Sequence, residues 1–458
     1  MPRFKHIEKA ERVAEKARIK QKKIKKRPLL GEGNTLWQRI RSAPHARGYT
    51  EFLFYCIFLF VLAFFVDQPA TIFRGYLNII LSPSHLITDY VAVGGLGATF
   101  LNSASVTLLS LIFLYSRRVK ISGPIIAALF TMSGFAFFGK NILNSVPIMM
   151  GSLIYSIVSQ ISFSQVAIIS LFSTALGPMV SMLWLGVGLK PLIGIPLGIL
   201  IGLLIGFISP PLAGSFLRFH RGYNLYNVGF TAGIIGMVFT ALLRMFDVKM
   251  EPILLISTEH SLLLGIFIGL LSLLLIVTGL WRKRDAWKEY TTLLKQPGQL
   301  ITDFTKHVSV ETTLCNMGIM GLLSCGYIIA LDGTINGPVI GGVLTVIGFA
   351  AFGVHPGNGL SVMLGVGLAA ITNNVPYNDT SAIIAALFGT TLAPLAGQYG
   401  TFVGVIAGFI HMAMCLNVGY LHGGINLYNN GFSGGFVAAV LAPLLEDWQI
   451  RKNKGKTK

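Results

Sequence analysis

Long apolar stretches alternate with short polar ones along most of the chain. From Phe52 to Leu445, stretches of about twenty mostly apolar residues follow one another, the length that an α-helix needs to cross roughly 30 Å of hydrocarbon. The strict alternation of polar and apolar positions that marks a membrane β-barrel does not occur in them. The pattern therefore predicts transmembrane helices, because a helix satisfies its own backbone polar groups in lipid.

Part of this pattern occurs twice. The segment Ile121–Gly139 (ISGPIIAALFTMSGFAFFG) aligns without a gap with Ile335–Gly353 (INGPVIGGVLTVIGFAAFG), 214 positions later. The match continues on both sides and places Asn102 over Asn316. Self-similarity over such a length indicates a duplicated unit that spans most of the chain.

Clusters of Lys and Arg divide the apolar stretches into groups. They lie in the first 50 residues, at Arg117–Lys120, at Arg218–Arg221, at Trp281–Lys288 and at the end of the chain. The positive-inside rule places such clusters in the cytoplasm, and an even number of apolar stretches lies between neighbouring clusters. We therefore expect about fourteen membrane segments, both termini in the cytoplasm, and the cell (plasma) membrane as the location.

The two copies then have opposite orientations. The first copy turns at a basic cluster, whereas the second turns at Leu331–Asn336, which carries no cation and is expected outside. The expected fold class is an all-α integral membrane protein of two inverted-topology repeats, each of about seven transmembrane helices, with broken or half-membrane helices. The expected parts are a basic cytoplasmic arm (1–50), repeat 1 (51–250), repeat 2 (251–446) and a basic cytoplasmic tail (447–458).

Composition excludes an ordinary soluble globular protein, because 53% of the residues are hydrophobic and only 12% are charged. The basic arm is expected to bind anionic lipid and no nucleic acid, although docking of RNA or a protein is the alternative. The four cysteines lie in apolar stretches without metal-ligand spacing, so we expect them to be packing residues. Neither a metal nor a cofactor is expected.

Two polar openings follow the best-matched helices. After GFAFFG comes KNILNSVP, and after GFAAFG comes VHPGNGLS, so Asn141, Asn144, His355 and Asn358 begin new apolar helices. Helix N-termini present free N–H donors and a partial positive charge. If both openings lie deep, we expect them to meet near the membrane midplane and bind a polar solute. The alternative is that they are ordinary turn and N-cap residues.

A second polar phrase also occurs twice, as HRGYNLYNVGFTAG from His220 and HGGINLYNNGFSGG from His422. On helical spacing the two asparagines of each NLYN segment share a face, and the glycines that follow form a small-residue pair that permits close helix packing. We expect the segments to line one central solute pathway, with structural hydrogen bonds as the alternative. The candidate substrate-binding residues here are Asn224, Tyr226, Asn227, Asn426, Tyr428 and Asn429.

Acidic side chains are nearly absent from the apolar stretches. Asp67, Asp89, Asp332 and Asp379 are expected at loop edges. A carrier coupled to protons or cations usually has an intramembrane carboxylate, so this distribution favours a neutral polar solute or a small anion. No GxxxxGK[ST] motif occurs, and ATP coupling within this chain is not expected.

The segments FFGKNILNSVPIMMGSLI and HRGYNLYNVGFTAGIIG resemble the two signature elements in each half of urea transporters. The resemblance covers about forty residues in each half, and it implies passive conduction of a small amide-like solute past Asn144, Asn358 and the NLYN segments. Two departures weaken it: KNILN lacks the proline of the family motif, and seven segments in each half exceed the five plus a pore helix of that family. An uncharacterised bacterial membrane family is the wider expectation.

The leading function is therefore a membrane transporter or channel for a small polar solute, through a central site at the repeat interface. One rival is an intramembrane enzyme that uses His220, His355, His411 and His422. The motif HExxH is absent, and GFSGG (Gly431–Gly435), which has the GxSxG spacing, does not follow a strand-like stretch as a nucleophile elbow would, so no enzyme activity is expected. The other rival is a scaffold that docks partners through its basic arm. Whether the protein forms a homo-oligomer is left open.

Overall fold

The computed structural model describes most of the chain. The described residues are 46–84, 87–248, 254–300, 302–372 and 375–456. Most of the predicted basic arm and the last two residues of the predicted tail lie outside them. The chain divides into two units, Met1–Thr50 and Glu51–Lys458, and the second holds both repeats.

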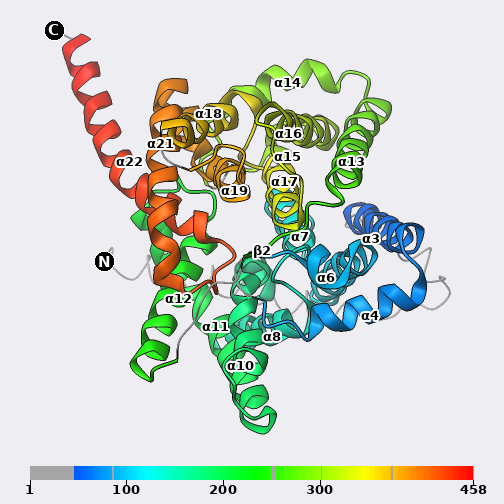
Figure 1. The fold of residues 1–458 in the computed structure, drawn as a ribbon. Helices are drawn as coiled ribbons and strands as arrows, with labels where there is room; N and C mark the ends of the chain where they lie inside the picture. The colour runs from blue at the N-terminus through cyan, green and yellow to red at the C-terminus, as the bar shows by residue number, and fades with distance from the viewer. Residues whose placement is uncertain (1–45, 85–86, 249–253, 301, 373–374, 457–458) are drawn as a thin grey trace, which may run out of the picture. The chain divides into compact units, whose positions relative to one another are not determined.

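The two repeats contain helices in the same order (Figure 1). The first repeat consists of α3 (Ala46–Val66), α4 (Pro69–Ile80), α5 (Tyr90–Gly94), α6 (Leu96–Ser116), α7 (Gly123–Phe135), α8 (Ile142–Val158), η1 (Phe163–Gln165), α9 (Ala167–Ser173), η2 (Thr174–Leu176), α10 (Gly177–Leu185), α11 (Pro191–Phe219) and α12 (Asn227–Met245). The second repeat consists of α13 (Ser261–Arg282), α14 (Ala286–Leu294), α15 (Phe304–His307), α16 (Val310–Ala330), α17 (Gly337–Phe349), α18 (Pro356–Thr372), α19 (Thr380–Gly389), η3 (Thr390–Leu392), α20 (Ala393–Tyr399), α21 (Thr401–Val418), η4 (Gly419–His422) and α22 (Asn429–Lys456). A short parallel pair joins β1 (Ile87–Thr88) to β2 (Leu254–Leu255).

Three consecutive helices have the same length in both repeats. Helices α6 and α16 have 21 residues each, α7 and α17 have 13, and α8 and α18 have 17. Each begins 214 positions after its counterpart. The duplication inferred from the sequence is therefore a duplication of structure.

The helices have the lengths and composition of membrane spans. In the described part of the chain, 9 helical stretches are long and apolar enough to cross a membrane. Helices α7, α8, α17 and α18 are apolar but shorter, and α22 has 28 residues and continues into the charged end of the chain. The predicted class, an all-α multi-pass membrane protein with half-membrane helices, is confirmed.

One span in each repeat is broken in the middle. The 3₁₀ turn η2 separates α9 from α10, and η3 separates α19 from α20. Pro178 and Pro394 follow these turns within the first two residues of α10 and α20. Proline has no backbone N–H and cannot donate to a carbonyl one turn earlier, so the helix tightens or breaks there.

The repeats are inverted with respect to one another. Helices α7 and α17 lie side by side and antiparallel, since Gly134 packs on the backbone of Gly341 and Gly348 packs on that of Ala127 (Figure 1). A twofold axis that relates two antiparallel neighbours is perpendicular to both helices. For membrane-crossing helices it lies in the membrane plane, as expected for inverted-topology repeats.

Candidate functional site

The N-terminus of each short helix lies against the turn that follows the other one. A Cβ atom on Gly123 would lie 2.7 Å from Ala351 O, and one on Gly337 would lie 2.6 Å from Phe137 O. Thirteen residues of α-helix are about 20 Å long, so the two turns lie at opposite ends of this helix pair. The polar openings that follow the turns therefore do not meet, which corrects the expectation that both line one site at the midplane.

The first opening satisfies its own polar groups. Asn141 Oδ1 accepts the N–H of Asn144 at 3.0 Å, and Asn144 Oδ1 accepts the N–H of Asn141 at 3.0 Å, which is a reciprocal capping box. The Asn144 amide donates to Gly139 O at 3.0 Å and to Ser181 Oγ at 2.9 Å. Both asparagines are fully buried, and their amides fix the turn between α7 and α8.

The second opening repeats this geometry. Asn358 Oδ1 accepts the N–H of His355 at 2.8 Å, and its amide donates to Gly353 O at 3.0 Å. His355 Nε2 lies 2.9 Å from Gln296 O, in the segment that follows α14. These contacts match the alternative in which the openings are turn and cap residues, although they leave solute binding untested.

The two asparagines of each NLYN segment lie in different surroundings. Helix α12 begins at Asn227 and α22 at Asn429, so the preceding asparagines lie outside the helices. Asn224 Oδ1 accepts the N–H of Tyr226 at 3.2 Å, and Asn426 Oδ1 accepts the N–H two residues on at 3.0 Å. This side-chain turn competes with helix formation, so the predicted shared helical face is wrong.

Each NLYN segment is bound to the broken span of the other repeat. The N–H of Leu225 donates to Thr391 O in η3 at 2.9 Å, and the N–H of Leu427 donates to Ala175 O in η2 at 3.1 Å. Asn224 also donates its amide to Gly431 O at 2.9 Å. The duplicated phrase thus holds the two repeats together at the twofold axis.

The glycines after each NLYN segment pack across the repeats as predicted. A Cβ atom on Gly229 would lie 3.2 Å from the Cα of Gly431, and one on Gly233 would lie 2.4 Å from the ring of Phe432. Larger side chains at these places would separate α12 from α22, so small residues are required for this close approach.

Six aromatic side chains meet at the centre of the interface, three from each repeat, and we name them the central aromatic cluster. They are Phe135, Phe172, Tyr226, Phe349, Phe388 and Tyr428, and all are buried. The rings of Tyr226 and Tyr428 lie 4.9 Å apart between centroids, Tyr226 lies 4.4 Å from Phe349, and Tyr428 lies 4.7 Å from Phe135. The duplicated tyrosines are therefore brought together, as the single-pathway expectation requires.

A cavity of about 410 Å³ reaches the central aromatic cluster from one side, and we name it the vestibule. Tyr226, Tyr428 and Phe349 lie at its inner end, with Asn227 beside them. Asn227 donates to Ala213 O at 3.0 Å and lies 2.9 Å from His220 Nε2. Asn429, the counterpart of Asn227, begins α22 and is half-buried.

The twofold-related side is more closed. Half-buried residues that line the vestibule are Ser122, Pro124, Ile168, Ile169 and Thr302. Their repeat counterparts are Asn336, Pro338, Ile384, Ala385 and Thr88, and all are buried. Asn336 donates its amide to Thr380 Oγ1 at 2.8 Å on that closed side. The same elements are therefore open at one end of the axis and packed at the other.

Asp89, on the closed side, is a buried aspartate that was not predicted as a site residue. Asp89 was expected at a loop edge, but it is fully buried at the N-terminus of α17. Its carboxylate accepts the N–H groups of Gly337 at 3.2 Å, Ser257 at 3.1 Å and Val91 at 2.9 Å. The signal that could have found it is the duplicated phrase LITD, at residues 86–89 and again at 300–303.

Its counterpart lies at the mouth of the vestibule. Asp303 accepts from Thr305 N at 3.2 Å and from Thr305 Oγ1 at 2.6 Å, and it pairs with Lys306 at 3.4 Å. A Cβ atom on Gly123 would lie 2.5 Å from Asp303 Oδ1, so this carboxylate faces the N-terminus of α7. The two aspartates each stabilise the positive end of the other repeat's short helix.

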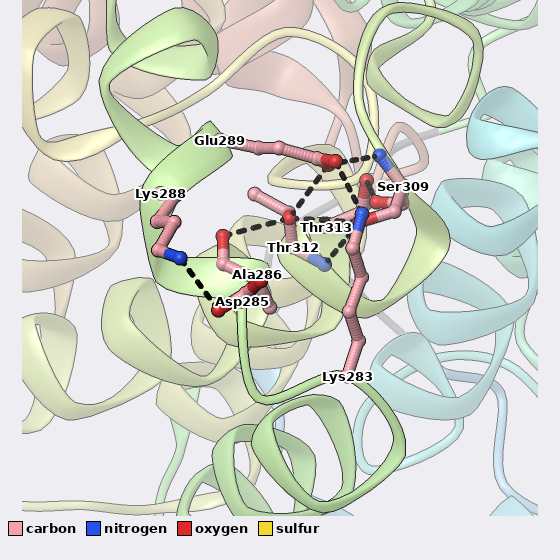
Figure 2. Close-up of polar contacts among 8 residues, drawn as sticks. All are labelled: Lys283, Asp285, Ala286, Lys288, Glu289, Ser309, Thr312 and Thr313. Carbon is pink, nitrogen blue, oxygen red and sulfur yellow. Dashed lines mark hydrogen bonds and ion pairs between the residues drawn. The ribbon is translucent and has the colours of Figure 1, made fainter.

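Polar contacts attach α14 to the N-terminus of α16, and Asp303 lies in the segment between these two helices (Figure 2). Glu289 on α14 forms an ion pair with Lys283, accepts the N–H of Ser309 at 2.8 Å and accepts Thr312 Oγ1 at 3.2 Å. The Lys283 ammonium, together with the donors on Ser309, holds the pKa of the Glu289 carboxyl at about 2. Helix α14 is thereby fixed to the N-terminus of α16.

The histidines do not form a common centre. His220 bonds Asn227, His355 bonds a backbone carbonyl, and His411 Nε2 lies 3.1 Å from Asn430 Oδ1. Within the described ranges, no group of three or more His, Cys, Asp and Glu side chains is placed to hold a metal ion.

A family model described as "Protein of unknown function (DUF1576)" matches residues 68–245 and 282–447. The matched stretches cover most of both repeats. No curated protein and no solved structure matches the chain. The likeness to urea transporters stays a prediction.

Proposed function

The chain belongs to the DUF1576 family of proteins of unknown function, and from that premise we propose that it is a membrane transporter that carries a small polar solute through the interface of its two repeats. The observation that carries this proposal is the unequal packing of twofold-related elements. Vestibule residues such as Ser122 and Thr302 are half-buried, whereas their counterparts Asn336 and Thr88 are buried. If the open side closes while the closed side opens, the central site becomes accessible from each side of the membrane in turn.

The proposed direction of the vestibule follows from charge. Its mouth lies next to Arg117–Lys120 in the chain, and the positive-inside rule places that cluster in the cytoplasm. The protein is then in its inward-open form in the cell (plasma) membrane, with both termini cytoplasmic. We also propose that the basic arm binds anionic lipid.

The proposed solutes are a neutral amide-like compound or a small anion. Tyr226, Tyr428 and Asn227 offer hydroxyl and amide groups among aromatic rings at the inner end of the vestibule. The buried carboxylate of Asp89 is already occupied by backbone N–H groups. Because the aromatic cluster closes the path beyond the vestibule, alternating access explains the geometry better than the open pore that a urea-transporter likeness would imply. Catalysis is not part of the proposal.

Uptake into proteoliposomes tests this function. We expect the purified protein to speed the entry of at least one solute from a set of urea, acetamide, acetate, lactate and nitrate, relative to protein-free liposomes. Substitution Gly229→Leu, which would separate α12 from α22, is expected to abolish that flux. Entry at the protein-free rate for every solute, from correctly folded protein, would refute transport of this class.

A further inference from the structure

A lysine side chain is buried beside the central aromatic cluster. Lys140 follows α7, and its side chain is almost completely buried. The ammonium lies 3.2 Å from Met132 Sδ and 5.0 Å from the centroid of the Phe135 ring. None of the ion pairs between described residues includes it.

These neighbours compensate the charge poorly. A thioether is a weak acceptor, and an ammonium has three donors to satisfy. The ring of Phe135 and the C-terminal end of α7 attract a cation. Among the described hydrogen bonds, however, the only one from the Lys140 ammonium goes to the sulfur of Met132. Buried charges are normally paired, and ionisable groups at membrane depth mark functional sites more often than structural ones. A bound anion would supply the partner that the charged form of this lysine needs.

One aromatic ring, that of Phe135, connects the ammonium to the inner end of the vestibule. Phe135, which it contacts, also packs on Tyr428 with ring centroids 4.7 Å apart. Thr174, the first residue of η2, places its hydroxyl oxygen 3.2 Å from the same Met132 sulfur. Lys140, Tyr428 and η2 are thus connected through Phe135 and Met132. A shift of the Phe135 ring would open a path from the vestibule to the ammonium.

The fold itself does not require this lysine. The equivalent position in repeat 2 is Val354, which is buried in a turn of the same geometry. The counterpart of Met132 is Val346. Because the second repeat forms the same turn without a cation, the charge at position 140 serves something other than the turn.

We propose that Lys140 is the recognition group for the charge of the transported solute, and that this solute is a small monocarboxylate with an apolar body. The inference rests on the proposed transport function and chooses the anion from its two solute classes. The carboxylate pairs with the ammonium, and the apolar body lies against Phe172, Tyr226 and Tyr428 at the vestibule.

Isosteric probes test the proposal in the full-length protein. Acetate, propionate and benzoate are compared with acetamide, propionamide and benzamide, by calorimetric binding in detergent and by uptake into proteoliposomes. We expect the carboxylates to bind at least about tenfold more tightly than their amides, since a buried ammonium without its partner charge is costly. Nitrate and chloride, which lack the apolar body, are expected to compete weakly.

The variant Lys140→Val gives position 140 the residue of the other repeat and is therefore expected to fold. We expect it to lose about tenfold or more in carboxylate affinity while amide affinity stays within about threefold. Lys190→Val, the same change at an exposed lysine, is the matched control and should leave both unchanged. If Lys140→Val lowers the melting temperature too far, Lys140→Met, which keeps the length of the side chain, replaces it.

Different results would overturn the role of Lys140 and the transport function. Wild-type protein that binds or carries the amides as well as the carboxylates, or Lys140→Val that keeps carboxylate affinity, overturns the assignment of Lys140. Wild-type protein that binds carboxylates through Lys140 but moves none of the six solutes overturns transport and leaves the anion site standing.

Discussion

At the scale of single residues, buried amides fix the turns that follow the two short helices. Asn144 illustrates the point, because its one side chain accepts from Asn141 and donates to Gly139 O and Ser181 Oγ. Asn358 makes equivalent bonds in the second repeat. The polar openings begin helices, as predicted. Their side-chain amides, however, donate to backbone carbonyls of the preceding turns.

Substitution Asn144→Ala is expected to lower stability by about 1–3 kcal/mol, because it leaves buried donors and acceptors of the turn unpaired. Thermal unfolding of the detergent-solubilised protein measures the change. Asn417→Ala is the control, since that asparagine is exposed and is expected to change stability by less than about 0.5 kcal/mol. Equal melting temperatures for both variants would contradict a structural role for Asn144.

The sequence revealed those functional candidates that occur in both repeats. The NLYN amides were found because they are repeated, but their conformation was misjudged, since Asn224 bonds the backbone two residues on instead of continuing a helix. Asp89 and Asp303 were visible in the duplicated LITD. No local pattern shows that Asp89 accepts from Gly337 or that Asp303 faces Gly123, each in the other repeat. The repeat counterpart of Lys140 is the apolar Val354, so a search for duplicated polar groups does not find this lysine.

At the scale of elements, short helices and broken spans follow from the sequence to different degrees. The match of Ile121–Gly139 to Ile335–Gly353 predicted an apolar helix that ends at a polar opening in each copy. It did not predict that these helices, α7 and α17, have only 13 residues each. The 3₁₀ turns η2 and η3 were not predicted. Their only local signal is a proline after each turn, and membrane helices often tolerate proline without a break.

Helix α14 gives a pH-dependent prediction. The pKa of Glu289 is lowered to about 2 from an unfolded value of roughly 4.3, so its contribution to stability is complete above pH 4.3 and is lost as the pH falls toward 2. With the side chain 36% exposed, solvent screening limits that contribution to about 1 kcal/mol. Glu289→Gln should therefore melt earlier than wild type at pH 7, by a difference that shrinks below pH 4.3.

The neighbouring pair provides the control. Asp285 bonds Lys288 on the same helix but is 65% exposed, so Asp285→Asn should leave the melting temperature nearly unchanged at both pH values (Figure 2). A constant difference between Glu289→Gln and wild type from pH 7 to pH 3 would show that the carboxylate charge does not stabilise this turn.

At the scale of the whole membrane unit, the two ends of the twofold axis differ in packing although their sequences are related. Asp89 binds the N-terminus of α17 through a backbone N–H, whereas the described hydrogen bonds include none from the N-terminus of α7 to Asp303. This difference favours closure on the side of Asp89.

Substitution Asp89→Ala is therefore expected to loosen the closed side. The substitutions Ser122→Cys and Asn336→Cys are made singly in a background without the native cysteines. The detergent-solubilised protein, in which both sides are accessible, is labelled with a water-soluble thiol reagent. Ser122→Cys should react and Asn336→Cys should not. Adding Asp89→Ala is expected to raise the labelling of Asn336→Cys by about fivefold or more, a shift of about 1 kcal/mol. Asp303→Ala is the matched control and should not raise it; equal labelling of 336 in all backgrounds would refute the role of Asp89.

The mutual attachment of each NLYN segment to the other repeat also sets an order of events during synthesis. Tyr226 bonds a threonine that lies 165 residues further along the chain, so its partner emerges from the ribosome roughly ten to thirty seconds later. Until then the first NLYN segment lacks the hydrogen-bond partner that Thr391 provides in the complete protein. A chain that stops after the first repeat should therefore be recognised as unfinished and degraded, and co-expression of the second half as a separate chain should rescue it.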